Sequence, residues 1–235
     1  MLKLDLQFFG GRGASGGGGG GGGATGELVL PNGSKIEFEG TLHYDGNDKA
    51  LTGTARANIE GFEKKRIKNK VEYAYAVDAN GNPVGGEIRG SKGSVRVPRS
   101  YHEQPDGTFT HIHPRGDGML GGTFSQADLF NFANFGNKTV RAAAKEGTYS
   151  ISKGKNFDKQ GFKSFAAKAN SDFSANYRKR SGVAGKAYRE GKMSYGDYLK
   201  ANAKAFNTSL VEMHNTLRSG QKQYGYSYTL EKTNP

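Results

Sequence analysis

Short segments with alternating hydrophobic and polar residues run through the first two thirds of the chain and predict β-strands. Residues 27–39 indicate a hairpin, because Leu-Val-Leu is followed by the turn signal Pro31-Asn32-Gly33 and then by Ile36 and Phe38 in alternation. Turn-forming residues such as Asp-Ala-Asn-Gly-Asn-Pro separate the later segments. Further strands are expected at residues 71–77, 84–97, 109–113, 139–143 and 148–152.

Hydrophobic residues at helical spacing, or a helix-capping residue, mark four other segments, and these predict helices at residues 54–68, 126–135, 157–179 and 195–217. The last two helices follow one another after a change of pattern at Gly154. The chain then closes with Tyr224–Tyr228, a short aromatic strand or cap. A sheet-centred unit followed by a pair of helices is an α+β fold.

The beginning of the chain has a different composition from the rest. Residues 16–23 are consecutive glycines, which have no side chains to bury and lose much conformational entropy when they are ordered. We therefore expect residues 1–26 to form a disordered glycine-rich arm. The remaining chain is expected to divide into an α+β domain at residues 27–154 and a basic helical extension at residues 155–235 that packs on it.

Positive charge is concentrated toward the C-terminus. Residues 151–235 carry 16 Lys and Arg against 6 Asp and Glu, whereas residues 1–150 carry 18 against 16. This excess suits a phosphate backbone, so nucleic acid is expected to contact residues 151–235; a solvated helical surface is the alternative interpretation. The chain lacks cysteine, which excludes thiolate ligands and a cysteine nucleophile. It also lacks a run of 18 apolar residues, so no membrane contact is expected.

The residues best suited to chemistry are two histidines, a serine and an aspartate. His111 and His113 are two positions apart on a predicted strand, so their imidazoles point to one face and offer two nitrogens to one divalent ion. Ser125 and Asp128 follow a glycine-rich loop at residues 114–122. If Ser125 begins a helix, the carboxylate of Asp128 can turn back toward the strand end. Two histidines, one carboxylate and a water would complete a tetrahedral zinc site with one open position.

These residues resemble a known motif. His-Ile-His-Pro followed by Ser-Gln-Ala-Asp is similar to the His-x-His-Pro … Ser-x-x-Asp motif of the JAB (JAMM) metalloprotease superfamily, although the loop at residues 114–124 is longer than is usual there. The wider pattern through residues 72–81, 90–95 and 147–151 resembles the JAB-like domains of phage minor head proteins, related to head protein F of phage Mu, and of bacterial polymorphic toxins. The opening Met-Leu-Lys-Leu-Asp-Leu-Gln-Phe-Phe resembles starts of phage structural proteins.

The resemblance implies a mixed sheet with flanking helices and a zinc-dependent hydrolase of peptide, isopeptide or other amide bonds. His111, His113 and Asp128 would bind the zinc ion, and Ser125 would hydrogen-bond the oxyanion of the tetrahedral intermediate. An upstream glutamate would take a proton from the attacking water, and Glu72 is chosen because it opens a strand expected beside the histidine strand. The glutamates that remain as alternatives are Glu60, Glu63 and Glu87.

Other interpretations of the same features stay open. Ser-x-x-Asp before an apolar residue is also a capping box, a purely structural helix start. The alternative function is a non-catalytic minor virion protein, whose arm would bind phage structural proteins and whose basic helices would face packaged DNA. Both functions imply a place in the bacterial host cytoplasm or the phage virion. His43, His102 and His214 have no partner motif, and His214 is expected to be a surface or packing residue.

Overall fold

The computed structural model describes residues 23–30, 33, 35–114, 116 and 118–232. In chain order the elements are β1 (Gly23–Val29), β2 (Lys35–His43), α1 (Gly53–Arg66), β3 (Tyr73–Val77), β4 (Ile88–Arg89), the 3-10 helix η1 (Arg99–Tyr101), β5 (Thr108–Ile112), α2 (Gln126–Asn134), β6 (Thr139–Ala144), β7 (Gly147–Lys153), α3 (Lys159–Arg189), α4 (Tyr195–Ser219), α5 (Gln221–Tyr224) and β8 (Tyr226–Glu231). Residues 1–22 of the predicted arm lie outside the described residues. The last residues of that arm, 23–26, form the start of β1, where Gly23 pairs with His43 of β2.

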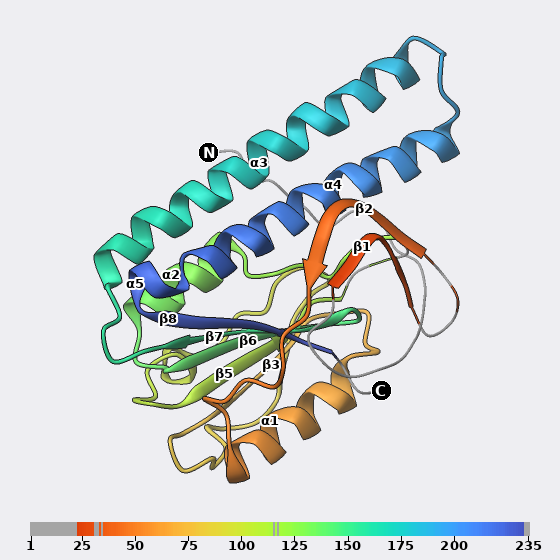
Figure 1. Cartoon of the computed structure of the whole chain (residues 1–235). Coiled ribbons are helices and arrows are strands. Elements are labelled where there is room, and N and C mark those ends of the chain that lie inside the picture. Colours follow the sequence, from red (N-terminus) through yellow and green to blue (C-terminus); the bar gives the residue numbers. More distant parts are fainter. Residues whose placement is uncertain (1–22, 31–32, 34, 115, 117, 233–235) are drawn as a thin grey trace.

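Six strands form one mixed sheet in the order β4-β3-β5-β6-β7-β8. Only β5 and β6 are parallel, and α2 connects them; the other neighbours are antiparallel. Helix α1 covers one face of the sheet, while α2, α3 and α4 lie over the other (Figure 1). The fold is therefore α+β with a mixed sheet and flanking helices, as the sequence predicts.

The helical pair is joined to the sheet at both ends. After α4 and α5 the chain returns as β8, which pairs with β7 from Thr148 opposite Glu231 to Lys153 opposite Tyr226. The boundary expected between residues 154 and 155 thus separates β7 from β8, although these two strands are neighbours in one sheet. Removal of everything after Gly154 would expose the edge of β7.

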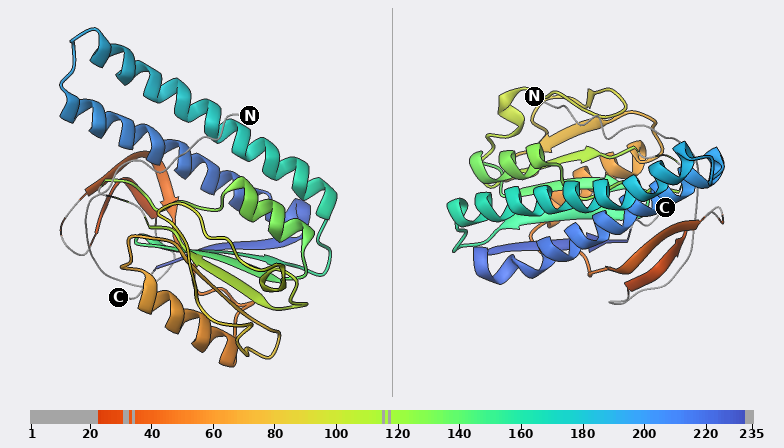
Figure 2. Two further views of the ribbon diagram at one scale, coloured as in Figure 1. Left: turned by 180° about the vertical axis from the view of Figure 1, so that it is seen from behind. Right: turned by 90° about the horizontal axis from the view of Figure 1, so that it is seen from above.

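Helix α3 is longer than predicted, because it continues past Lys179 to Arg189 through Gly182 and Gly185. Glycine weakens an isolated helix, but here α4 packs alongside α3 and tertiary contacts outweigh local propensity. The outer part of the α3–α4 hairpin projects beyond the sheet (Figure 2).

A second difference concerns the strands expected at residues 84–97, where only β4, two residues long, is present. Gly85 has a positive φ of 79°, and the amide of Ser91 donates to the carbonyl of Ser94 (2.8 Å) in a tight turn. These turns interrupt the alternation that suggested longer strands.

The core lies between the sheet and the α3–α4 pair. Its fully or almost fully buried side chains include Tyr149, Ile151, Phe162, Phe206, Leu210, Leu217 and Leu230. The β1–β2 hairpin lies along α4, where the Asn207 side chain donates to the carbonyl of Glu37 (2.9 Å). Within the described ranges, no helix combines the length and apolar character needed to cross a membrane.

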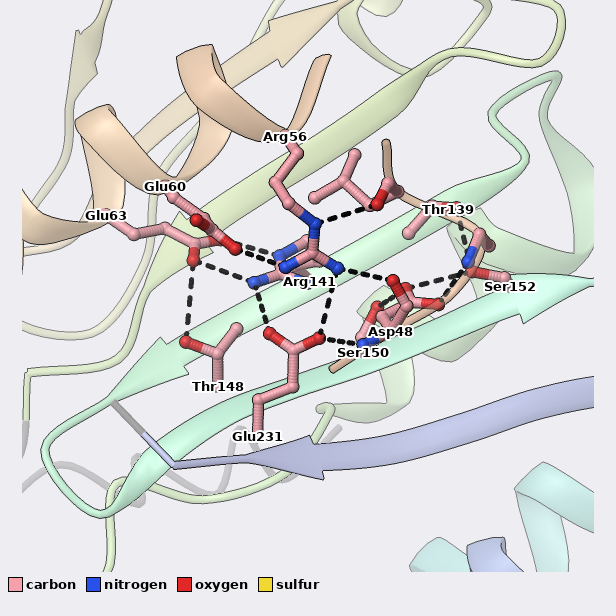
Figure 3. A network of polar contacts seen from close by, with 12 residues as sticks. Asp48, Arg56, Glu60, Glu63, Thr139, Arg141, Thr148, Ser150, Ser152 and Glu231 are labelled. Carbon is pink, nitrogen blue, oxygen red and sulfur yellow. Dashed lines mark hydrogen bonds and ion pairs between the residues drawn. The ribbon is translucent and has the colours of Figure 1, made fainter. Parts of the chain in front are cut away.

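The opposite face of the sheet, under α1, buries a network of charged and hydroxyl groups (Figure 3). Arg141 of β6 is 1% exposed and donates to both carboxylate oxygens of Glu63 (2.8 and 3.0 Å) and to Glu231 (3.0 Å). The hydroxyl of Thr110 also donates to Glu63 (2.7 Å), and the amide of Asp48 donates to Glu231. The network ties α1 and β8 to the centre of the sheet, and each buried charge depends on its partners.

Candidate metal centre

The two histidines of the predicted motif lie at the end of β5, on the face away from the Arg141 network. His111 is within the strand, and His113 follows its last residue while its amide still donates to the carbonyl of Ala143 on β6 (2.8 Å). Alternation along the strand therefore keeps both rings on one face. Thr110, the residue before His111, points to Glu63 on the other face.

Asp128 completes a convergent group with these histidines. The Nε2 atoms of His111 and His113 are 2.7 Å apart, and Oδ1 of Asp128 is 3.4 Å from Nε2 of His111. Oδ2 of Asp128 is 4.0 Å from Nε2 of His113. One donor atom from each residue lies within 4.8 Å of the other two, so all three can face one ion.

Asp128 belongs to a capping box as well, so the two interpretations of Ser-x-x-Asp coexist. Ser125 is the N-cap of α2, and its hydroxyl oxygen accepts from the amide of Asp128 (3.2 Å). Oδ2 of Asp128 in turn accepts from the Ser125 amide (2.8 Å) and hydroxyl (2.7 Å). These bonds hold the carboxylate in place and leave Oδ1 turned toward His111, which is the usual arrangement of a hydrogen-bonded metal carboxylate.

The expectation for Ser125 differs from what the structure shows. Its hydroxyl proton is directed to Asp128 rather than toward a substrate position. Ser125 is exposed, and its hydroxyl would have to rotate away from Asp128 before it could donate to an oxyanion.

The loop before α2 sets the orientation of His113. Nδ1 of His113 lies 3.1 Å from the carbonyl oxygen of Gly122, which can only accept, so Nδ1 carries the proton and Nε2 keeps its lone pair. That is the tautomer a metal ligand requires. Gly122 has φ of 104°, and a Cβ at Gly121 would meet that of Ala144 at 2.3 Å, so the path of this loop requires glycine at both positions.

Glu146, in the β6–β7 turn, accepts hydrogen bonds from the backbone of the same loop. Its side chain is buried and accepts from the amides of Gly121 (2.9 Å) and Gly122 (3.1 Å), and from the hydroxyl of Tyr149 (3.1 Å). Burial raises the pKa of Glu146, although these donors partly offset that effect. Glu146 is thus connected to His113 through Gly122, a role that no local sequence pattern indicates.

The charges of the centre favour an ionised Asp128 and a basic His111. Burial alone would lower the pKa of His111, but the nearby carboxylates of Asp128 and Glu72 outweigh it and raise the pKa. Burial alone would raise the pKa of Asp128, yet His111, His113 and the Ser125 hydrogen bond hold it well below its usual range. Negative potential of this kind attracts a cation. Nδ1 of His111 makes no hydrogen bond of normal geometry within the described ranges, although the Arg141 backbone favours protonation of this ring.

Glu72, the predicted general base, lies one residue before β3, the strand that pairs with the histidine strand β5. Ala74 of β3 is directly opposite His111, and Glu72 stands two residues before Ala74. Its side chain is buried and its charge acts on His111.

The other three glutamates are engaged elsewhere. Glu63 belongs to the Arg141 network on the far face of the sheet, Glu60 pairs with Arg56 on α1, and Glu87 accepts from Lys65 (2.8 Å) and Arg66. Among the four, Glu72 is the one whose charge acts on His111, and it remains the predicted general base.

His102 is a residue near the centre that carries no sequence motif. Its ring lies against Phe109 (4.6 Å between centroids) and Phe135 (5.6 Å). Burial lowers its pKa, and the charges of Asp128 and His111 act on it in opposite directions. His102 is therefore a neutral, half-buried imidazole at the edge of the centre.

The C-terminal elements also reach this loop. The hydroxyl of Tyr228 on β8 lies 2.9 Å from that of Thr123 and 3.0 Å from Nδ1 of His214. Nε2 of His214 lies 3.1 Å from the carbonyl oxygen of His43. His214 is thus a packing residue, and it connects α4 to β2 through His43 and to β8 through Tyr228.

The residues present fit a divalent metal. Two imidazole nitrogens and one carboxylate oxygen suit zinc and several other first-row ions. Ligands about 2.05 Å from a tetrahedral ion lie about 3.3 Å apart, so the two Nε2 atoms would separate by roughly 0.6 Å, within the reach of small χ rotations. Three protein donors leave a fourth position for a reacting group, which distinguishes catalytic from structural zinc sites. Comparison of the chain with protein-family models, with curated proteins and with solved structures found no match.

Proposed function

We propose that this protein is a zinc-dependent hydrolase of peptide, isopeptide or other amide bonds, of the JAB-like kind that its motif resembles. The observation that carries the proposal is the meeting of His111, His113 and Asp128 at one point, together with the separate buried carboxylate Glu72, whose charge acts on His111. A purely structural site would need a fourth protein ligand, and a purely structural capping box would not need the histidines.

Each residue has a distinct task in this proposal. A bound zinc ion supplies Lewis acidity toward a water and a carbonyl oxygen. Glu72 accepts a proton from the water and passes it to the leaving amine, which suits a carboxylate that is not itself a ligand. Ser125 donates to the developing oxyanion after its hydroxyl turns from Asp128. Glu146 and Gly122 keep His113 in the tautomer whose Nε2 can bind the metal.

Turnover is the direct test. The full chain is loaded with zinc and incubated with pools of quenched fluorescent peptides, some carrying a lysine side-chain amide as the scissile bond. We expect cleavage of at least one pool, and we expect Glu72→Gln to reduce the rate by about 100-fold or more, the usual contribution of a general base. Zinc affinity of that variant should stay within a few-fold of the wild type.

Glu87→Gln is the matched control, because it makes the same chemical change at a glutamate paired with Lys65 and Arg66. It should cleave at the wild-type rate. Equal rates for Glu72→Gln and the wild type would contradict the catalytic role of Glu72. Absence of cleavage in every pool by zinc-loaded protein would favour the non-catalytic virion function.

A further inference from the structure

The outer part of the α3–α4 hairpin, residues 178–204, is an exposed extension that the core does not explain. We call this segment the hairpin tip. Helix α3 has 31 residues, which corresponds to about 46 Å, and the tip reaches past the sheet (Figure 2). Ala184 is the one buried residue within the tip, whereas the inner part of α4 buries a continuous stretch from Ala205 to Val211. The tip is therefore a helical arm that buries few side chains, with only its inner end reaching β2 through Lys204 and Glu39 (3.6 Å).

The charge of the tip is strongly positive. Residues 178–204 contain eight Lys and Arg and two acidic residues. Four of the cations, all exposed, make no ion pair with any residue in the described part of the chain: Arg178, Lys179, Arg189 and Lys200. Such a cluster attracts a polyanion and gains counterion-release free energy on contact with phosphates.

Three tyrosines gather at the end of the hairpin, and Arg189 follows Tyr188 directly in the sequence. The rings of Tyr188 and Tyr198 are stacked, with centroids 5.2 Å apart and planes within 20°. Tyr195 lies 5.8 Å from Tyr188 and is 54% exposed, and Tyr188 is 41% exposed. Core packing does not account for rings this exposed, since the buried aromatic Phe206 lies farther in along α4. An aromatic platform next to free cations is the combination that binds nucleobases and their phosphates together.

We propose that the hairpin tip binds single-stranded nucleic acid, with Arg178, Lys179, Arg189 and Lys200 contacting phosphates and Tyr188 and Tyr195 stacking on bases. A single strand is the partner because its base faces are open for stacking, whereas those of a duplex are covered. This inference does not depend on the metal centre, and it narrows the basic region of residues 151–235 to one surface.

Fluorescence anisotropy of a labelled oligothymidine of about 20 nucleotides tests the proposal on the full chain. Four phosphate contacts to a single strand predict a log–log salt slope of about −3, so affinity should fall about 50-fold between about 50 and 200 mM NaCl. The oligothymidine should bind more tightly than a duplex of the same length. Point variants are used because β8 belongs to the sheet and deletion of the region would disturb it.

Two matched charge variants locate the surface. In the tip variant, Gln replaces Arg178, Lys179, Arg189 and Lys200. In the control variant, Gln replaces four exposed lysines elsewhere, Lys49, Lys64, Lys68 and Lys138. Both lose the same charge, but we expect the tip variant to lose the salt dependence and most of the affinity, while the control weakens binding only a few-fold.

The aromatic contribution is read from Tyr195, whose exposure makes its substitution mild for folding. Tyr195→Leu should weaken oligothymidine binding about tenfold, and Tyr195→Phe should retain it, because the ring and not the hydroxyl stacks. Equal losses in the tip and control variants would overturn the proposal. So would tighter binding of the duplex, or binding of vesicles with anionic lipid but not of the oligothymidine.

Discussion

Replacement of His214 by glutamine should abolish a defined part of the pH dependence of stability. The side chain is 0% exposed. Its Nε2 must carry the proton, because the His43 carbonyl it contacts (3.1 Å) can only accept, so Nδ1 accepts from the hydroxyl of Tyr228 (3.0 Å). Both nitrogens are therefore occupied in the neutral ring. Burial, followed by the charge of Arg218, lowers the pKa of His214 to about 3.

The magnitude follows from proton linkage. The unfolded chain binds a proton at His214 with a pKa near 6.5, while the folded protein does not until about pH 3. Stability from this residue is complete above pH 6.5 and is lost progressively as the pH falls toward 3. Between about pH 7.5 and 5, protonation of His214 in the unfolded chain lowers the free energy of unfolding by about 2 kcal/mol. Because pH 5 is well above the folded pKa, this figure depends mainly on the unfolded value.

Urea unfolding at about pH 7.5 and 5 measures the effect. Glutamine can donate to the His43 carbonyl and accept from Tyr228 without taking up a proton. The loss of unfolding free energy between the two pH values should therefore be about 2 kcal/mol smaller in His214→Gln than in the wild type. His43→Gln makes the same chemical change at an exposed histidine and is the matched control. If His214→Gln and the wild type show the same dependence, His214 is not held neutral and the reasoning fails.

Two further variants test buried charged side chains, one on each face of the sheet. Arg141→Gln leaves the buried carboxylates of Glu63 and Glu231 without their main partner, so urea unfolding should show a loss of about 3–5 kcal/mol, and a loss below about 1 kcal/mol would refute the importance of this network. Glu146→Gln keeps the size of the side chain but weakens acceptance from two loop amides, so a chelator competition assay should show zinc affinity reduced about 10- to 100-fold; unchanged affinity would show that the loop positions His113 without Glu146.

Local patterns were sufficient to predict the parts of this fold that short segments determine. Alternation at residues 109–113 and 139–143 predicts β5 and β6, and the capping residue Ser125 predicts the start of α2. The same periodicity places His111 and His113 on one face. The convergence of Asp128 follows once α2 begins at Ser125, because the first turn of the helix faces the end of β5.

The features that were missed depend on contacts between distant residues. Glu146 carries no motif, and its role appears only when the β6–β7 turn meets the loop at Gly121 and Gly122. His214 is in a basic helical segment, yet its partners come from residues 43 and 228, so its complete burial has no local signal. The extension of α3 beyond Lys179 was hidden by glycines that weaken helix propensity, since only packing on α4 compensates for them.

The predicted division at residue 154 gives no sign of the strand pairing that crosses it, for a similar reason. The change of pattern there is real, because strands give way to long helices. The strand β8 nevertheless pairs with β7, and strand pairing across more than 70 residues leaves no periodic mark in the sequence.

Zinc stoichiometry tests the central claim most directly, namely that His111, His113 and Asp128 hold one divalent ion. Metal-free full chain is titrated with zinc against a competing chromophoric chelator, alongside Asp128→Asn and a variant with glutamine at both histidines. We expect one zinc ion per chain for the wild type, clearly weaker binding for Asp128→Asn, and no tight binding for the double histidine variant, while all three remain folded. Tight binding that survives removal of both histidines, or a wild-type protein that takes up far less than one equivalent, would contradict it.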